Sequence, residues 1–227
     1  MFPADATSTH RAVRIPGALL ACAICVAAAA MAAAETRVAT MDYGHLLAAA
    51  KADPLHADYA ALRAAYAASP GYSPLAGLAP ETRGEMLSSM AAGDWRTALA
   101  KANAILGVYW LDIQAHMTAA GAAASLADSG AASLHRAAAA GLLSAVVSSG
   151  DGRSPATALV VINAGEERAL IGALGARATG RRLVRLGGHA YDRIGVTGEQ
   201  GEAGTIFFNV DAPLGGHAAP IAGRPPD

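Results

Sequence analysis

The chain has 227 residues and a formal net charge of −1, with 17 Lys and Arg against 18 Asp and Glu. A chain so close to neutral lacks the basic footprint of a nucleic-acid-binding protein, and no nucleic-acid partner is predicted. Its two cysteines, Cys22 and Cys25, both lie near the N-terminus, so neither disulfides nor thiol chemistry are expected in the rest of the chain.

Residues 1–34 have the three parts of a secretory signal peptide. Arg11 and Arg14 give a positive start, no charged residue follows from Ile15 to Ala34, and the segment ends in small alanines. This pattern predicts export, with a mature chain from Glu35 in the periplasm or outside the cell and no membrane insertion of that chain.

Two alternatives remain for this leader. It has about the length of a spanning helix, so an uncleaved leader would anchor the protein in the membrane. The other is a lipoprotein, in which Leu19–Ala21 precedes a lipidated Cys22. The small-residue exit favours cleavage, and the apolar run continues past Cys22, which argues against lipidation.

A helical pattern runs from about residue 41 to 149. Apolar residues recur three and four positions apart, and the breaks fall at Asp53–Pro54, at residues 69–74, at Gly93–Asp94 and at Asp128–Gly130. The last two breaks lie about 35 residues apart, close to the spacing of tetratricopeptide helix pairs. The pattern predicts antiparallel helical hairpins that resemble tetratricopeptide repeats.

The periodicity changes after residue 149. Residues 157–162 form a continuous apolar run that predicts a buried central strand, and Glu166–Glu167 begin a helix. Three more strands are expected at Arg182–Leu186, His189–Val196 and Thr205–Asp211, the first two joined by a Gly187–Gly188 hairpin turn.

These segments predict an α+β fold in which N-terminal helical hairpins pack on a small, mostly antiparallel C-terminal sheet. No flexible linker separates the helical part from the sheet part at about 155–211, so one domain is expected over residues 35–211. Residues 212–227, which contain Gly and Pro, are expected to form a disordered tail.

Several segments in this order resemble the DUF4919 family, a secreted bacterial domain of unknown function. They are DYAALRAAYAASPGYSP (58–74), GDWRTALAKANAIL (93–106), LDIQAH (111–116), SGDGRSPATALVVINAGEE (149–167), HAYD (189–192) and IFFNVD (206–211). Arg168 departs from the aromatic residue that often follows the Glu-Glu pair. The resemblance implies an α+β domain and no particular activity.

Asp112 and His116 are the first candidates for chemistry. They lie four residues apart on an expected helix, and His135 on the next helix could come close to them. A carboxylate beside an imidazole suits a general base or part of a metal site, but zinc needs three or four ligands. The simpler interpretation is an i,i+4 pair on the helix surface.

Asp151, Glu166 and Asp192 are three further acidic candidates for catalysis. Asp151 lies between two glycines, where a plain turn explains it. Glu166 and Glu167 suit the first turn of a helix. Asp192 is expected to share the core face of its strand with Ile194, where a carboxylate needs a partner unless a bulge or a sheet edge exposes it.

The sequence therefore supports two hypotheses. The first is a non-catalytic module that binds another envelope protein or a peptide through its helical hairpins. The second is a periplasmic, hydrolase-like enzyme that uses Asp112, His116, Asp151, Glu166 and Asp192 where the helices meet the sheet. Asp112, His116 and His135 are the candidate metal ligands, and no cofactor is predicted.

Overall fold

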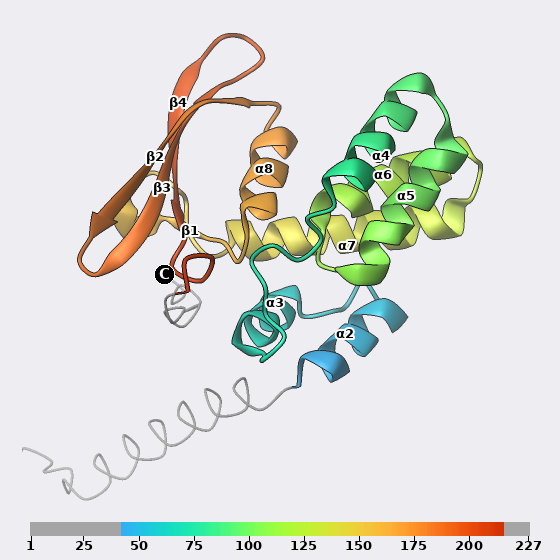
Figure 1. Ribbon diagram of the computed structural model, residues 1–227, viewed down its shortest axis with the longest axis horizontal. Helices are drawn as coiled ribbons and strands as arrows, with labels where there is room; N and C mark the ends of the chain where they lie inside the picture. The colour runs from blue at the N-terminus through green and yellow to red at the C-terminus, as the bar shows by residue number, and fades with distance from the viewer. Residues whose placement is uncertain (1–41, 216–227) are drawn as a thin grey trace, which may run out of the picture. The chain divides into compact units, whose positions relative to one another are not determined.

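The computed structural model describes residues 42–215, which all belong to one compact unit, and the predicted leader lies outside them. Helices come first and a small sheet last, which confirms the α+β class (Figure 1). The elements are α2 (Tyr43–Ala52), α3 (Tyr59–Ala68), α4 (Pro80–Ala92), α5 (Trp95–Val108), α6 (Ile113–Ser125), α7 (Ser129–Val147), the 3-10 turn η1 (Pro155–Thr157), β1 (Leu159–Val160), α8 (Ala164–Ala173), β2 (Arg177–Leu186), β3 (His189–Thr197) and β4 (Ala203–Asn209).

Aspartate caps begin four of these helices. Asp58, Asp94, Asp112 and Asp128 each accept a hydrogen bond from the backbone N–H three residues later, at the starts of α3, α5, α6 and α7. Such caps satisfy a backbone donor that the first helical turn leaves free. The two predicted breaks at Gly93–Asp94 and near Asp128 are therefore confirmed.

Helices α4, α5, α6 and α7 pack in chain order as neighbours joined by short turns (Figure 1). Met86, Ile105 and Leu106 with the small residues of α6 form one core between them. Helices α2 and α3 contact each other, and α3 packs on α7. A second core joins α2, α3 and α7 to Ile162 and Ala169, so residues from the helical part and from the sheet part share it.

The sheet has four strands in the order β1-β4-β3-β2. The pairs β2–β3 and β3–β4 are antiparallel and β1–β4 is parallel. The prediction of a mostly antiparallel sheet is therefore confirmed. Gly187 and Gly188 make the predicted hairpin turn with φ angles of 61° and 84°, which glycine adopts without strain.

The prediction of a central strand over residues 157–162 is wrong. Strand β1 has two residues and lies at one edge of the sheet. The apolar run is buried because Leu159 and Val161 join a core with Val146 of α7 and Leu170 and Ile171 of α8. Its continuous hydrophobicity thus reflects cover by helices and not a central position.

Strand β2 begins five residues earlier than predicted, at Arg177, and is exposed along almost all of its length. At the other end of the sheet part, residues 212–215 form a turn in which Ala212 is buried. The remainder of the expected tail, from residue 216, lies outside the described residues.

Candidate functional site

A buried ion pair joins the helical part to the sheet part. Arg63 of α3 and Glu166 of α8 form two hydrogen bonds of 2.7 Å, and both side chains are at most 1% exposed. Burial alone lowers the pKa of Arg63, but the Glu166 carboxylate more than offsets this, so the pKa of Arg63 lies above its ordinary value. The Glu166 carboxylate therefore keeps the buried Arg63 guanidinium charged.

The remaining bonds of this pair go to the backbone of α7, of β1 and of the segment between β1 and α8. Arg63 donates to the carbonyls of Ala145 in α7 at 3.2 Å and of Val160 in β1 at 2.8 Å. Glu166 Oε2 accepts the N–H of Ile162 at 2.9 Å. The pair thus fixes α3, α7, β1 and α8 to one another. All the side-chain nitrogen and oxygen atoms of Arg63 and Glu166 take part in these structural bonds.

Tyrosines surround the pair. Tyr72 donates its hydroxyl to the carbonyl of Ile162 at 2.7 Å, and the Tyr109 hydroxyl accepts from Asn163 Nδ2 at 2.8 Å. Burial, together with neighbouring negative charge, raises the pKa of Tyr72 to about 12 and that of Tyr109 well above its ordinary value. Both hydroxyls stay protonated at neutral pH, as hydrogen-bonded groups of the core. We call Arg63, Glu166, Tyr72, Tyr109 and Asn163 the junction cluster.

Asp112 lies beside this cluster. Its carboxylate caps α6 and contacts Arg83 Nη2 at 2.5 Å, and Arg83 also donates to Gln114 at 2.8 Å. Asp112 and Glu166 line one small crevice of about 10 Å³, which has room for about one water molecule. Two of the five catalytic candidates therefore meet here, in a space too small for a substrate.

His116 is completely buried and does not form the expected surface pair with Asp112. Its Nε2 lies 2.8 Å from the carbonyl of Trp110, and its Nδ1 lies 3.0 Å from Nδ1 of His135. Because a carbonyl can only accept, His116 carries its proton on Nε2, and His135 donates from Nδ1. Burial lowers the pKa of His116 to about 4 and that of His135 below its ordinary value.

The close approach of His135 to His116 is as predicted, but Asp112 is engaged with Arg83 and with the backbone of α6. Within residues 42–215 no three His, Cys, Asp or Glu side chains come together in a way that could hold a metal ion. The two imidazoles are therefore a hydrogen-bonded contact between α6 and α7.

Asp192 does face the core side of β3, as its alternation with Ile194 predicted, and it is 8% exposed. Arg181 of β2 is its partner, with 3.2 Å between Nε and Oδ2, and the same guanidinium pairs with the buried Glu167 of α8. This three-residue bridge connects α8 to β2 and β3.

Asp151 is exposed, and its carboxylate accepts the N–H of Arg153, which closes a turn.

One carboxylate–imidazole pair was not predicted. Asp211 Oδ2 lies 2.6 Å from His189 Nδ1, and Asp211 also accepts from the N–H of Ala190 and from Asn209. These hydrogen bonds outweigh the effect of burial and lower the pKa of Asp211. The pair connects the start of β3 to the residues after β4.

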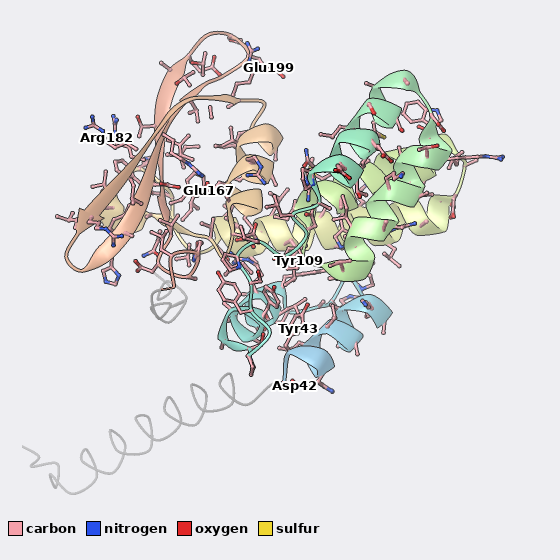
Figure 2. All side chains as sticks on the ribbon, in the orientation of Figure 1. Asp42, Tyr43, Tyr109, Glu167, Arg182 and Glu199 are labelled. Atoms are coloured by element: carbon pink, nitrogen blue, oxygen red, sulfur yellow. The ribbon has the colours of Figure 1, made fainter. Side chains whose placement is uncertain are left out.

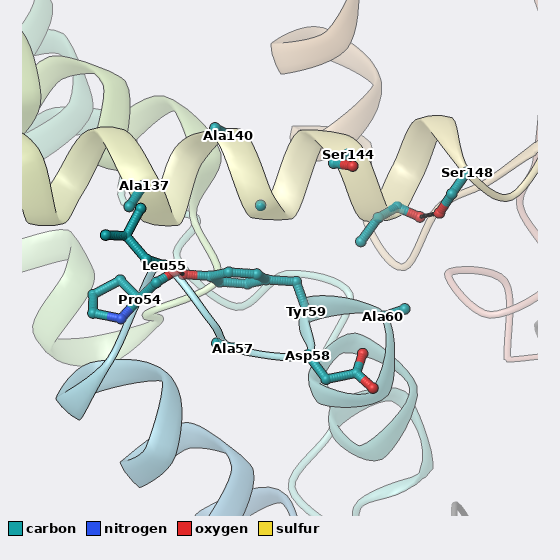
Figure 3. Close-up of a pocket in the computed structure, with 12 residues that line it drawn as sticks. Pro54, Leu55, Ala57, Asp58, Tyr59, Ala60, Ala137, Ala140, Ser144 and Ser148 are labelled. Atoms are coloured by element: carbon teal, nitrogen blue, oxygen red, sulfur yellow. Dashed lines mark hydrogen bonds between the residues drawn. The ribbon is translucent and has the colours of Figure 1, made fainter.

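An open groove of about 450 Å³ runs between α3 and α7 (Figure 3). Its α7 wall consists of small side chains, and the other wall contains Pro54, Leu55, Asp58 and Tyr59. Leu55 is 78% exposed although it is a large apolar side chain. Gly141 of α7 leaves room for the Tyr59 ring, since a Cβ there would lie 2.2 Å from it. Because Arg63 binds the carbonyl of Ala145, a lining residue, the junction cluster holds the two walls together.

The family model described as a domain of unknown function, DUF4919, matches residues 34–217. The chain belongs to the DUF4919 family. No curated protein and no solved structure matches it.

Two segments that carry the DUF4919 resemblance meet in the junction cluster. Arg63 and Tyr72 come from residues 58–74, and Asn163 and Glu166 come from residues 149–167. The sequence analysis did not identify Arg63 as the partner of Glu166. A signal was present, since Arg63 lies on the same helical face as Leu62 and Tyr66. An arginine on an apolar face requires a buried acid.

Proposed function

We propose that this DUF4919 chain is an exported, non-catalytic module that binds an apolar peptide segment of another envelope protein in the groove between α3 and α7. The observation that carries the proposal is the groove itself, with small side chains on one wall and the exposed Leu55 beside the buried Tyr59 on the other (Figure 3). A concave site with apolar walls and few polar groups suits a peptide better than a charged ligand.

Helix α7 supports this choice of partner. It is the one helix in residues 42–215 that is long and apolar enough to cross a membrane, and only 33% of its most apolar stretch is buried. Arg136 is its one Lys, Arg, Asp or Glu residue. A surface helix normally presents a charged face, so an exposed helix with so little charge is suited to being covered by an apolar partner.

The positions of the acidic candidates also favour binding over catalysis. Glu166, Asp112 and Asp192 each have an arginine partner, and His116 is bonded on both ring nitrogens. A general base needs a site where its reactive atom reaches a substrate. The proposal of export rests on the composition of residues 1–34.

Selection from a random-peptide display library on the protein tests the proposal. We expect enriched peptides that are rich in apolar residues and that no longer bind Ser144→Trp, because the indole fills the groove. Ser133→Trp is the matched control, since Ser133 is also exposed on α7 but does not line the groove. Peptides that bind Ser144→Trp as well as wild type would contradict the proposal, and so would a library from which no peptide is enriched.

A further inference from the structure

The outer face of the sheet, on the side away from α8, carries arginines without acidic partners. Arg182 of β2 lies directly opposite Arg193 of β3, and Arg193 lies opposite Phe207 of β4. Both arginines are exposed, and Arg182 points away from α8 (Figure 2). Arg177 lies on the same face, because the bulge between Ala178 and Gly180 shifts the alternation by one residue.

The molecule offers these arginines little compensation. Strands β2 and β3 contain five arginines and one acidic residue, Asp192, which already pairs with Arg181 on the other face. Within the described part of the chain, no ion pair includes Arg177, Arg182 or Arg193. Like charges directly opposite each other weaken a strand pair unless an anion lies between them. An acidic partner would relieve this repulsion.

The same strand offers a backbone surface. β2 lies at the end of the sheet and pairs with β3 on one side, so its other edge carries unpaired N–H and C=O groups within the described residues. It spans ten residues, nearly all exposed. A long exposed edge is a template for an added strand.

We infer that the free edge of β2 binds an extended acidic segment of a partner protein, which adds a fifth strand to the sheet. Its backbone would pair with β2, and its carboxylates would lie over Arg177, Arg182 and Arg193. Arginine forms two parallel hydrogen bonds with a carboxylate, so this face recognises acidic side chains at alternate positions of the added strand. The surface is separate from the groove between α3 and α7.

A labelled synthetic peptide of alternating Glu and Val tests the inference by fluorescence anisotropy with the full chain. We expect binding that weakens with salt, that falls by about tenfold or more in the double variant Arg182→Gln/Arg193→Gln, and that is unchanged in Arg96→Gln/Arg136→Gln. The control pair removes the same charge from α5 and α7. A peptide with methylated backbone nitrogens at alternate residues should not bind, and Ser144→Trp should bind as wild type does.

Three results would overturn the inference. Equal weakening in the two double variants would show attraction to overall charge, and full binding of the methylated peptide would show that the β2 edge is not used. Vesicles containing phosphatidylglycerol that bind through Arg182 and Arg193, while the acidic peptide does not bind, would assign the face to a membrane surface.

Discussion

Charged residues play opposite parts in the junction cluster and on the outer sheet face. In the junction cluster Arg63 and Glu166 are buried, and their hydrogen bonds connect α3 to α7, to β1 and to α8. On the outer face Arg182 and Arg193 are exposed and face each other. Charges of the first kind are needed for the fold, whereas charges of the second kind are available to a partner.

The largest expected effect comes from removing one partner of the junction pair. Glu166→Ala leaves the Arg63 guanidinium buried without its counter-charge, so we expect the free energy of unfolding to fall by about 3–5 kcal/mol in urea denaturation. The double variant Arg63→Met/Glu166→Leu should recover most of this loss. A loss below about 1 kcal/mol in Glu166→Ala would contradict a structural role for the pair.

The next effect is acid destabilisation through His116. Its pKa is lowered to about 4 in the folded protein from 6.5, so the unfolded chain binds a proton first as the pH falls. The contribution of His116 to stability is therefore complete above pH 6.5 and is lost between pH 6.5 and about 4, by about 3 kcal/mol.

Urea denaturation across this pH range checks the prediction. His116→Gln removes the titrating group, so its free energy of unfolding should fall less steeply with acid than that of wild type. The same slope in both proteins would show that His116 is not the group responsible.

A smaller effect is expected at the wall of the groove. Gly141→Ala places a Cβ against the Tyr59 ring and should cost about 1–3 kcal/mol, measured by thermal or urea unfolding. Gly172→Ala is the matched helical control, because a Cβ there meets nothing within 4 Å, and it should stabilise α8 by about 0.5–1 kcal/mol. If Gly141→Ala were as stable as its control, Tyr59 would not pack closely on α7.

The smallest effect on stability is expected on the sheet. Arg182→Gln/Arg193→Gln removes a like-charge contact and should leave the free energy of unfolding unchanged or raise it by up to about 0.5 kcal/mol. A loss above about 1 kcal/mol would mean that these arginines stabilise the fold, and it would break the contrast with the junction cluster.

The sequence predicts helices and strands well where a local signal exists. The aspartate caps at Asp94 and Asp128 and the glycine pair at 187–188 are such signals, because each acts within a few residues. The position of β1 was not predictable in this way, since an apolar run looks the same in a central strand and in an edge strand covered by helices.

The partners of the candidate site residues could be predicted less well. Glu166 and Arg63 are 103 positions apart, and no short-range pattern connects them. Tyr191 alternates with Asp192 and so lies on the opposite face of β3, yet it is only 8% exposed. Burial of both faces of a strand depends on what packs there, which a strand's own sequence does not specify.

One comparison of variants tests the central claim, that the buried charges serve the fold and the groove serves binding. Peptides selected on the wild-type protein would be measured against Ser144→Trp and against Arg63→Met/Glu166→Leu by anisotropy. We predict that binding is lost in Ser144→Trp and kept in the double variant, which lacks both junction charges. Binding that survives in Ser144→Trp and disappears in a folded Arg63→Met/Glu166→Leu protein would contradict the account.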